Sequence, residues 1–353
     1  MKAARVLGKL QMEVQEVAMP PLDPDSIRVK VMACAICGTD RRIYTVGDYR
    51  AQYPVTVGHE IAGVVSAVGD HVENGAFKVG DRVCVAPGHG CGHCEICHKG
   101  YPNVCINPNP SMGYKLDGGF AEYLSVPEHI YRLGFVNKIP ENLTFEQASM
   151  SEIIACCLNA QHNTRVEAGD TVLVMGAGPA GIIHAILSKH YGAGRVIIAQ
   201  RSEARLNMCK ERFSDVIDDF VCMSRQDLKQ EVMRITEGKG ADCVFVCAPS
   251  AQAQESAFDL ANARGRINLF GGLPKDGSLI TIDANVIHYK ELQVSGASSS
   301  RPSDNQEALR LLSDRVIDPD KLITHVFALT RIIEAFDVAQ SRDCIKIVIK
   351  CGE

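Results

Sequence analysis

Four cysteines lie close together in the run GCGHCEICHKGYPNVC, namely Cys91, Cys94, Cys97 and Cys105. Short loops between them allow four thiolates to surround one Zn²⁺ ion, and a site with four protein ligands is closed and structural. Disulfide bonds and a zinc ribbon for nucleic acid are the alternatives. An odd total of 15 cysteines disfavours the first, and 37 basic against 42 acidic residues leave no basic stripe for the second.

A second set of possible metal ligands is scattered along the chain. Cys37 precedes the neighbours His59 and Glu60, and Glu152 follows much later. One thiolate, one imidazole and carboxylates suit Zn²⁺, and scattered ligands are typical of a catalytic site with an open coordination position. Each residue taken alone has a plainer interpretation, as a core cysteine, a buried histidine or a surface acid. Cys34 with Cys37 could also form a redox pair.

A glycine-rich loop follows the apolar run 171–175 and leads into a helical segment. The loop residues that we expect to bind a dinucleotide are Gly176, Gly178, Pro179, Ala180 and Gly181. A strand before the glycines and a helix after them are the context that this fingerprint requires. Gly176 would allow the tight turn, Gly178 the approach of the pyrophosphate, and Gly181 the packing of helix on strand. A purely structural turn is the alternative.

The residues after the next expected strand favour a phosphorylated cofactor. NAD sites usually place Asp or Glu there to bind the ribose hydroxyls, whereas this chain has Gln200, Arg201 and Ser202, followed by Arg205. A carboxylate would repel a 2′-phosphate, but Arg201 and Arg205 can pair with it, and Ser202 can donate a hydrogen bond. We therefore expect NADP(H), with NAD(H) as the alternative, since Glu203 offsets part of the charge and surface arginines are often merely solvated.

The pattern of apolar residues changes twice along the 353 residues, which is typical of two domains of an α/β protein. Short β-branched runs predict irregular β structure at 27–33, 61–68, 82–86 and 120–126. Later strands are expected at 171–175, 195–199, 216–221, 242–247 and 264–270, with helices at 179–191, 203–212, 225–236 and 251–263. Such alternation predicts a parallel sheet covered on both faces, a doubly wound Rossmann domain. We place it at 152–291, with a catalytic domain at 1–151 and 292–353 that carries the four-cysteine lobe at 88–106.

The order of these motifs resembles that of the zinc-dependent medium-chain dehydrogenases. The resemblance rests on the run from Gly58 to Val65, the four cysteines, the run from Gly118 to Tyr123 and the glycine loop. It is strongest to the polyol branch, which includes sorbitol (iditol) and threonine dehydrogenases, also in the tail from Ile345 to Cys351. The resemblance implies a GroES-like catalytic domain, a Rossmann domain, two zinc ions per subunit and a homodimer or homotetramer.

The activity implied is hydride transfer between a secondary alcohol and NAD(P), with a polyol, sugar alcohol or sugar-alcohol phosphate as substrate. Thr39 matches the hydroxyl that carries the alcohol proton away, and Asp40 matches the carboxylate that orients His59. Cys37, His59, Glu60 and Glu152 match the catalytic zinc site, without deciding which glutamate binds zinc directly. An amino-alcohol dehydrogenase of the threonine type, an inactive relative and a quinone or enoyl reductase are the alternatives.

One position departs from the family pattern. Arg42 stands where many relatives have a histidine of the proton relay, and an arginine is a poor proton shuttle. It could bind an anion or face solvent, and we favour the solvated arginine. Together with Arg41 and Arg50 it makes a sugar phosphate or an acidic polyol worth testing.

Composition limits the remaining functional classes. The longest apolar stretch, 172–187, is interrupted by glycines and is too short to span a bilayer, and the first residues lack the apolar core of a secretion signal. We expect a cytoplasmic enzyme that acts on a small molecule, without nucleic-acid or membrane partners.

Overall fold

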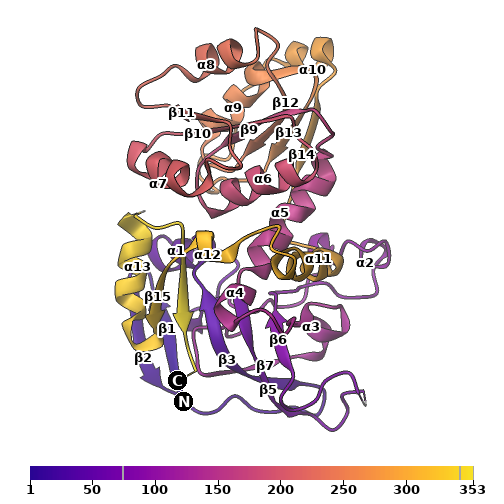
Figure 1. Cartoon of the computed structure of the whole chain (residues 1–353). Coiled ribbons are helices and arrows are strands. Elements are labelled where there is room, and N and C mark those ends of the chain that lie inside the picture. The colour runs from indigo at the N-terminus through magenta and orange to yellow at the C-terminus, as the bar shows by residue number, and fades with distance from the viewer. Residues whose placement is uncertain (74, 342, 353) are drawn as a thin grey trace. The chain divides into compact units, whose positions relative to one another are not determined.

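The computed structural model describes residues 1–73, 75–341 and 343–352, and its contacts divide the chain into two units (Figure 1). The first, the catalytic unit, comprises Met1–Ala155 and Ser300–Glu353, and the second, the nucleotide unit, comprises Cys156–Ser299. The first junction lies inside helix α5 (Ser151–Thr164), close to our boundary at 151. The second lies beyond our boundary at 291, because strand β14 (Gln293–Gly296) still pairs with the parallel sheet.

The nucleotide unit is built on a six-stranded parallel sheet in the order β11-β10-β9-β12-β13-β14. Besides β14, its strands are β9 (Thr171–Met175), β10 (Arg195–Gln200), β11 (Asp219–Cys222), β12 (Ala241–Val246) and β13 (Ala261–Leu269). Its helices after α5 are α6 (Pro179–His190), α7 (Glu203–Phe213), α8 (Leu228–Ile235), α9 (Ala251–Leu260) and α10 (Ala284–Lys290). The chain winds outward from β9 in one direction and then resumes at β12 in the other. This arrangement confirms the predicted doubly wound Rossmann sheet.

Tertiary pairing shifted some predicted ends. The expected helix 251–263 ends at Leu260, because Ala261 pairs with Ala241 and begins β13. The expected strand 216–221 begins only at Asp219, and the expected helix 225–236 begins at Leu228. There the side chain of Asp227 caps the helix by accepting a hydrogen bond of 2.8 Å from the backbone N–H of Gln230.

The catalytic unit contains a seven-stranded and a three-stranded sheet. The larger has the order β15-β16-β3-β5-β6-β8 with β7 paired to β3, and the smaller has the order β2-β1-β4. Their strands are β1 (Lys2–Gly8), β2 (Gln11–Glu16), β3 (Ile27–Ala35), β4 (Val55–Thr56), β5 (Glu60–Val68), β6 (Arg82–Val85), β7 (Tyr123–Val126), β8 (Val136–Lys138), β15 (Ile323–Ala328) and β16 (Lys346–Lys350). The predicted β run 120–126 thus forms a strand only from Tyr123.

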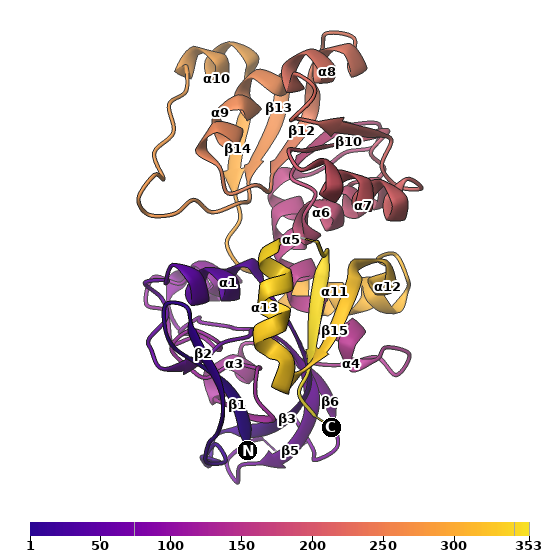
Figure 2. The ribbon, with the colours of Figure 1, turned by 90° about the vertical axis from the view of Figure 1, so that its left-hand side faces the viewer.

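Short helices surround these sheets. They are α1 (Gly38–Thr45), α2 (Glu95–His98), η1 (Pro102–Val104), α3 (Glu128–Arg132), α4 (Phe145–Ala148), α11 (Pro302–Ser313), α12 (Pro319–Leu322), η2 (Leu329–Arg331) and α13 (Ile332–Ser341). Figure 2 shows α13 lying along β15, and α13 also contacts β16. The C-terminal strand β16 pairs antiparallel with β3, so residues from both ends of the chain share one sheet and one core.

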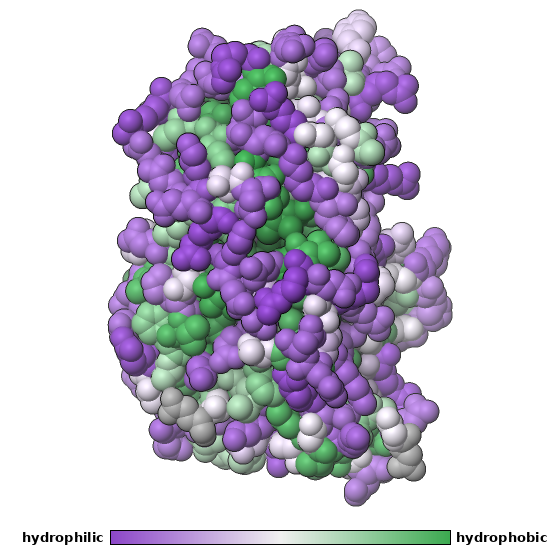
Figure 3. All heavy atoms as spheres, viewed as in Figure 1, coloured by the Kyte–Doolittle hydropathy of each residue, from purple (hydrophilic) through white to green (hydrophobic). Residues whose placement is uncertain are grey.

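Hydrophilic residues cover most of the face shown in Figure 3, with smaller apolar areas between them. Within the residues that the structure describes, no helix combines the length and the apolar character needed to cross a bilayer.

Candidate functional site

The donor atoms of Cys37, His59 and Glu60 lie within 4.8 Å of one another in the catalytic unit. Cys37 immediately precedes helix α1, and Glu60 begins strand β5 directly after His59. The turn before His59 requires a glycine, because Gly58 has φ +97 and an added Cβ would lie 2.8 Å from the sulfur of Cys34. Sulfur, imidazole nitrogen and carboxylate oxygen at this spacing fit a zinc ion.

Asp40 fixes the orientation of His59. Its carboxylate is fully buried and accepts hydrogen bonds from the backbone N–H groups of Cys37 (2.8 Å) and Gly58 (3.1 Å). Its Oδ1 lies 3.1 Å from Nδ1 of His59. Because Nδ1 faces Asp40, Nε2 is the imidazole nitrogen left for a metal, which is how carboxylates commonly position histidine ligands.

Glu60 is paired with a lysine that the sequence did not point to. The two carboxylate oxygens lie 2.6 and 2.5 Å from Nζ of Lys346, on strand β16, and both side chains are at most 1% exposed. Burial raises the pKa of Glu60, while the positive charge of Lys346 opposes this effect. A single lysine within the apolar run 345–349 was the available signal, since a buried lysine requires a partner.

Glu152 and Thr39 lie outside this group of three donors. Glu152 is the second residue of α5 and is 6% exposed, and it is near enough for its charge to add to the pKa rise that burial causes at Glu60. Thr39 lies in the first turn of α1, two residues after Cys37, and is partly exposed. The roles that we assigned to these two residues therefore stay predictions.

Aromatic and basic side chains continue outward from His59. The ring of Tyr114 lies 5.3 Å from the imidazole of His59, and the guanidinium of Arg50 lies 4.9 Å from the ring centre of Tyr114. Arg42 is 35% exposed, as expected for a solvated arginine, and also forms an ion pair of 2.8 Å with Asp48. Sequence reasoning had missed both Tyr114 and Asp48.

The four cysteines of the lobe converge as the spacing predicted. The sulfurs of Cys91 and Cys97 are 3.9 Å apart, and those of Cys94 and Cys105 are 3.8 Å apart. Four sulfurs arranged tetrahedrally at about 2.3 Å from a zinc ion have edges of about 3.8 Å, whereas disulfide sulfurs are about 2 Å apart. The geometry thus fits a closed zinc site, and these four cysteines are not disulfide-bonded.

Backbone N–H groups point at sulfurs of this lobe, although burial raises the pKa of Cys97 to about 12. The N–H of Cys97 points at the sulfur of Cys94 over 3.5 Å and lowers the pKa of Cys94 to about 6. The N–H of Cys91 donates similarly to the sulfur of Cys105 over 3.3 Å. Such N–H donors stabilise the charged form of a thiol, which is the form that binds metals.

The glycine loop of the nucleotide unit has the geometry required for a dinucleotide. Gly176 has φ +118, and an added Cβ at Gly181 would meet the carbonyl oxygen of Gly176 at 1.8 Å. An added Cβ at Gly178 would instead meet only Nη1 of Arg205, at 3.9 Å, so the space beside Gly178 is open for a phosphate. Pro179 and Ala180 begin helix α6, whose N-terminus favours an anion.

Residues at and just after the end of β10 lie beside this loop. Oε1 of Gln200 accepts a hydrogen bond of 3.0 Å from the N–H of Ala177, which engages Gln200 with the loop. Ser202 caps helix α7 by accepting a bond of 3.4 Å from the N–H of Arg205, and its hydroxyl hydrogen stays free to donate. Glu203, which we expected to offset the arginines, forms an ion pair of 2.5 Å with Arg225. Sequence reasoning missed Arg225, because it follows the next strand, β11.

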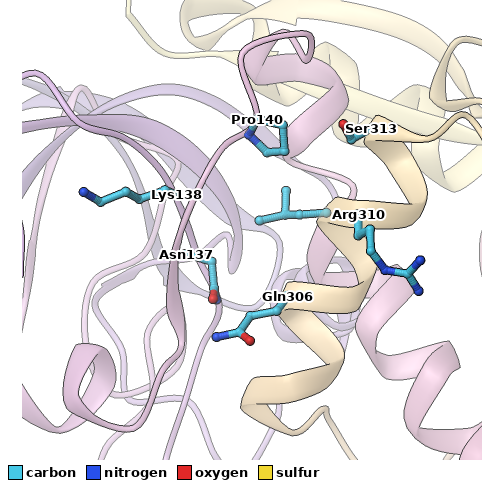
Figure 4. A pocket seen from close by; sticks show the side chains of 7 residues that line it. Asn137, Lys138, Pro140, Gln306, Arg310 and Ser313 are labelled. Carbon is cyan, nitrogen blue, oxygen red and sulfur yellow. The ribbon is translucent and has the colours of Figure 1, made fainter.

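A further hollow, of about 400 Å³, lies in the catalytic unit (Figure 4). Its lining residues are Asn137, Lys138, Pro140, Gln306, Leu309, Arg310 and Ser313. Figure 4 shows the charged ends of Lys138 and Arg310 directed away from it, and Lys138 pairs with Asp81 at 3.1 Å. It shares no residue with the metal donors or the glycine loop.

Known proteins resemble the chain over nearly its whole length. The family model of the alcohol dehydrogenase GroES-like domain matches residues 23–140, and that of the zinc-binding dehydrogenases matches residues 179–314. A sorbitol dehydrogenase of Bacillus subtilis is 30% identical, with 99% of this chain and 97% of that protein covered. A D-arabitol-phosphate dehydrogenase of Enterococcus avium is 31% identical, with 97% and 95% covered.

Solved structures of dehydrogenases also resemble the chain over nearly its whole length. One from Sinorhizobium meliloti 1021, provisionally described as a zinc-binding dehydrogenase and bound to NADP, has a TM-score of 0.88 and 30% identity, covering 99% of this chain and 98% of that one. An alcohol dehydrogenase of Escherichia coli CFT073 complexed with NADH has a TM-score of 0.88 and 31% identity, covering 99% of each chain. The chain therefore belongs to the zinc-binding alcohol dehydrogenase family, and the resemblance and fold class inferred from its motifs are confirmed.

Removing Lys346 should destabilise the protein strongly. Lys346→Met leaves Glu60 buried without its partner, which typically costs about 3 to 5 kcal/mol. We expect a lower free energy of unfolding, measured by urea denaturation. The double variant Glu60→Gln/Lys346→Met should recover part of the loss, since neither charge of this pair is then buried without its partner. Equal stability of Lys346→Met and the unsubstituted protein would contradict the importance of this pair.

Proposed function

We propose that the protein oxidises a secondary hydroxyl of a polyol, using zinc and a nicotinamide cofactor. One observation carries the proposal: Cys37, His59 and Glu60 place three zinc donors together in a chain of the zinc-binding dehydrogenase family. A zinc ion at this position would supply Lewis acidity, which lowers the pKa of a substrate hydroxyl.

The side chains around the donors then have distinct tasks. Asp40 holds His59 in one orientation, and Lys346 balances the charge of Glu60. We assign to Thr39, partly exposed in the first turn of α1, the uptake of the hydroxyl proton and its transfer toward solvent. A nicotinamide cofactor bound at the glycine loop would supply the acceptor for the carbinol hydride, so that the alcohol would become a ketone as NAD(P)⁺ is reduced to NAD(P)H.

The metal donors and the relatives support an oxygen-rich substrate. Carboxylates in place of a second thiolate make a harder site, which suits substrates with several hydroxyl groups. Two of the relatives are named for substrates of this kind, sorbitol and D-arabitol phosphate. Threonine-type amino alcohols are the competing substrate class, and a comparison of polyols with L-threonine as substrates separates the two classes.

Purified protein should oxidise polyols in preference to simple alcohols. We expect reduction of the nicotinamide cofactor, followed by absorbance at equal substrate concentrations, with sorbitol, arabitol or their phosphates. Ethanol, benzyl alcohol and L-threonine serve as comparison substrates. A higher kcat/KM for any of these three than for every polyol and polyol phosphate would overturn the substrate class.

We further infer two zinc ions per subunit, one at each set of donors. Cys97→Ser should remove one zinc ion and lower the melting temperature, because a closed site of this kind contributes to folding. His59→Ala should remove the other and abolish turnover with the melting behaviour largely retained. Metal analysis together with thermal unfolding tests both variants. One zinc or none in the unsubstituted protein, purified without chelators, would contradict this inference.

The arginines near the glycine loop support NADP(H) as the preferred cofactor. Arg205 lies beside Gly178, and Arg201 is exposed directly after β10. Arg225 pairs with Glu203, which reduces the repulsion that a 2′-phosphate would meet from this carboxylate. The same fold accommodates NADP in one solved relative and NADH in another, so these residues, not the fold, support the preference.

Arg201→Ala should weaken the binding of NADP⁺ about ten-fold to a hundred-fold, since a hydrogen bond to a charged group contributes about 1.5 to 3 kcal/mol. Binding of NAD⁺ should change little. Arg234→Ala is the matched control, because Arg234 is an exposed arginine of the same unit that pairs with Glu231 on helix α8. Titration of both cofactors gives the dissociation constants. If the unsubstituted protein binds NAD⁺ ten-fold more tightly than NADP⁺, the preference for NADP(H) is refuted.

A further inference from the structure

Two arginines share one carboxylate beside the metal donors of the catalytic unit. Asp48, whose side chain is 3% exposed, accepts hydrogen bonds from Nε of Arg42 at 2.9 Å and from Nε and Nη2 of Arg50 at 2.9 and 2.8 Å. Burial works against the charged form of Asp48, but the bonds from Arg50 and Arg42 outweigh this and lower its pKa. Asp48 is therefore a carboxylate at neutral pH, and the three side chains together carry an excess of one positive charge.

The excess charge is presented by Arg50. Its side chain is 42% exposed, and both of its bonds to Asp48 use Nε and Nη2. In the part of the chain that the structure describes, Nη1 of Arg50 has no hydrogen-bond acceptor. A guanidinium with one edge anchored and the other exposed is a pre-organised donor for a phosphate.

Arg50 is also held in a fixed direction relative to the metal donors. Its guanidinium stacks over Tyr114 at 4.9 Å, and the ring of Tyr114 packs against His59 at 5.3 Å. Two successive ring contacts thus link the guanidinium of Arg50 to the imidazole of His59. A molecule with a hydroxyl at the metal donors could reach Arg50 with its other end.

We propose that Arg50 binds the phosphate of a sugar-alcohol phosphate whose reactive hydroxyl lies at Cys37, His59 and Glu60. This inference rests on the proposed polyol dehydrogenase function and specifies its substrate class. Asp48 acts as a positioning residue that holds Arg50 through two side-chain hydrogen bonds, and the ring of Tyr114 packs against the guanidinium. A D-arabitol-phosphate dehydrogenase among the relatives shows that substrates of this class occur in the family.

The ratio of kcat/KM for a polyol phosphate to kcat/KM for the same polyol without phosphate tests the assignment. We expect the unsubstituted protein to prefer the phosphorylated compound in the pairs sorbitol and sorbitol 6-phosphate, and arabitol and arabitol 5-phosphate. Arg50→Gln should lower the ratio about ten-fold to a hundred-fold, mainly through a higher KM for the phosphate. Arg50→Lys keeps the positive charge but loses the planar guanidinium with its paired N–H donors, so it should lower the ratio by less than Arg50→Gln.

Arg132→Gln is the matched control, since Arg132 is an exposed arginine of the same unit, paired with Glu128 at 2.6 Å. It should leave the ratio unchanged. If Arg50→Gln fails to fold in a thermal melt, the comparison of Arg50→Lys with the control decides the question. A preference for the neutral polyol or for a sugar acid, or an equal ratio in the Arg50 variants and the control, would overturn the role of Arg50 while the polyol function stands. Oxidation of neither compound would overturn the function itself.

Discussion

A buried carboxylate next to a buried histidine requires a compensating positive charge, and this requirement ties the metal donors to the topology of the catalytic unit. Glu60 lies on β5, and its partner Lys346 lies on β16, with β3 between the two strands. An unpaired charge at such a depth costs several kcal/mol. The charge of Glu60 is balanced because the sheet places the C-terminal strand, with Lys346, beside β3. Lys346 is distant in sequence from the other site residues because it lies on this C-terminal strand.

The parts of the fold and site that the sequence predicted are those whose interactions are local along the chain. Cys91 and Cys97 are six residues apart, in the loop before α2 and in α2 itself, and this spacing limits where the sulfurs can lie. The glycine loop was equally clear, because the positive φ of Gly176 and the close packing of Gly181 leave glycine as the only residue that fits. The ends of β9 agreed with the prediction, since its apolar run is bounded by a polar residue and a glycine.

The parts that could not be predicted depend on contacts between segments distant in sequence. Ala261 belongs to a strand because it pairs with Ala241, although alanine favours a helix by its own propensity. Arg225, which pairs with Glu203, lies in the turn after the following strand, and Tyr114 reaches His59 from a separate loop. Arg42 looked like a surface residue because its partner, Asp48, becomes buried only when the segment after α1 folds back. No periodicity of the sequence encodes such pairs.

The two sets of metal donors obtain their charge balance by opposite means, and this difference bears on how each can form. In the lobe, the N–H of Cys97 in α2 points at the sulfur of Cys94, so the thiolate form of Cys94 is stabilised from within the same short segment. At His59 and Glu60 the balance comes from Asp40 and Lys346, on α1 and β16. The contacts of the lobe are thus local in sequence, whereas Glu60 depends on Lys346, 286 residues away, for its counter-charge. The metal donors at His59 and Glu60 are therefore tied to the packing of the large sheet in a way that the cysteine lobe is not.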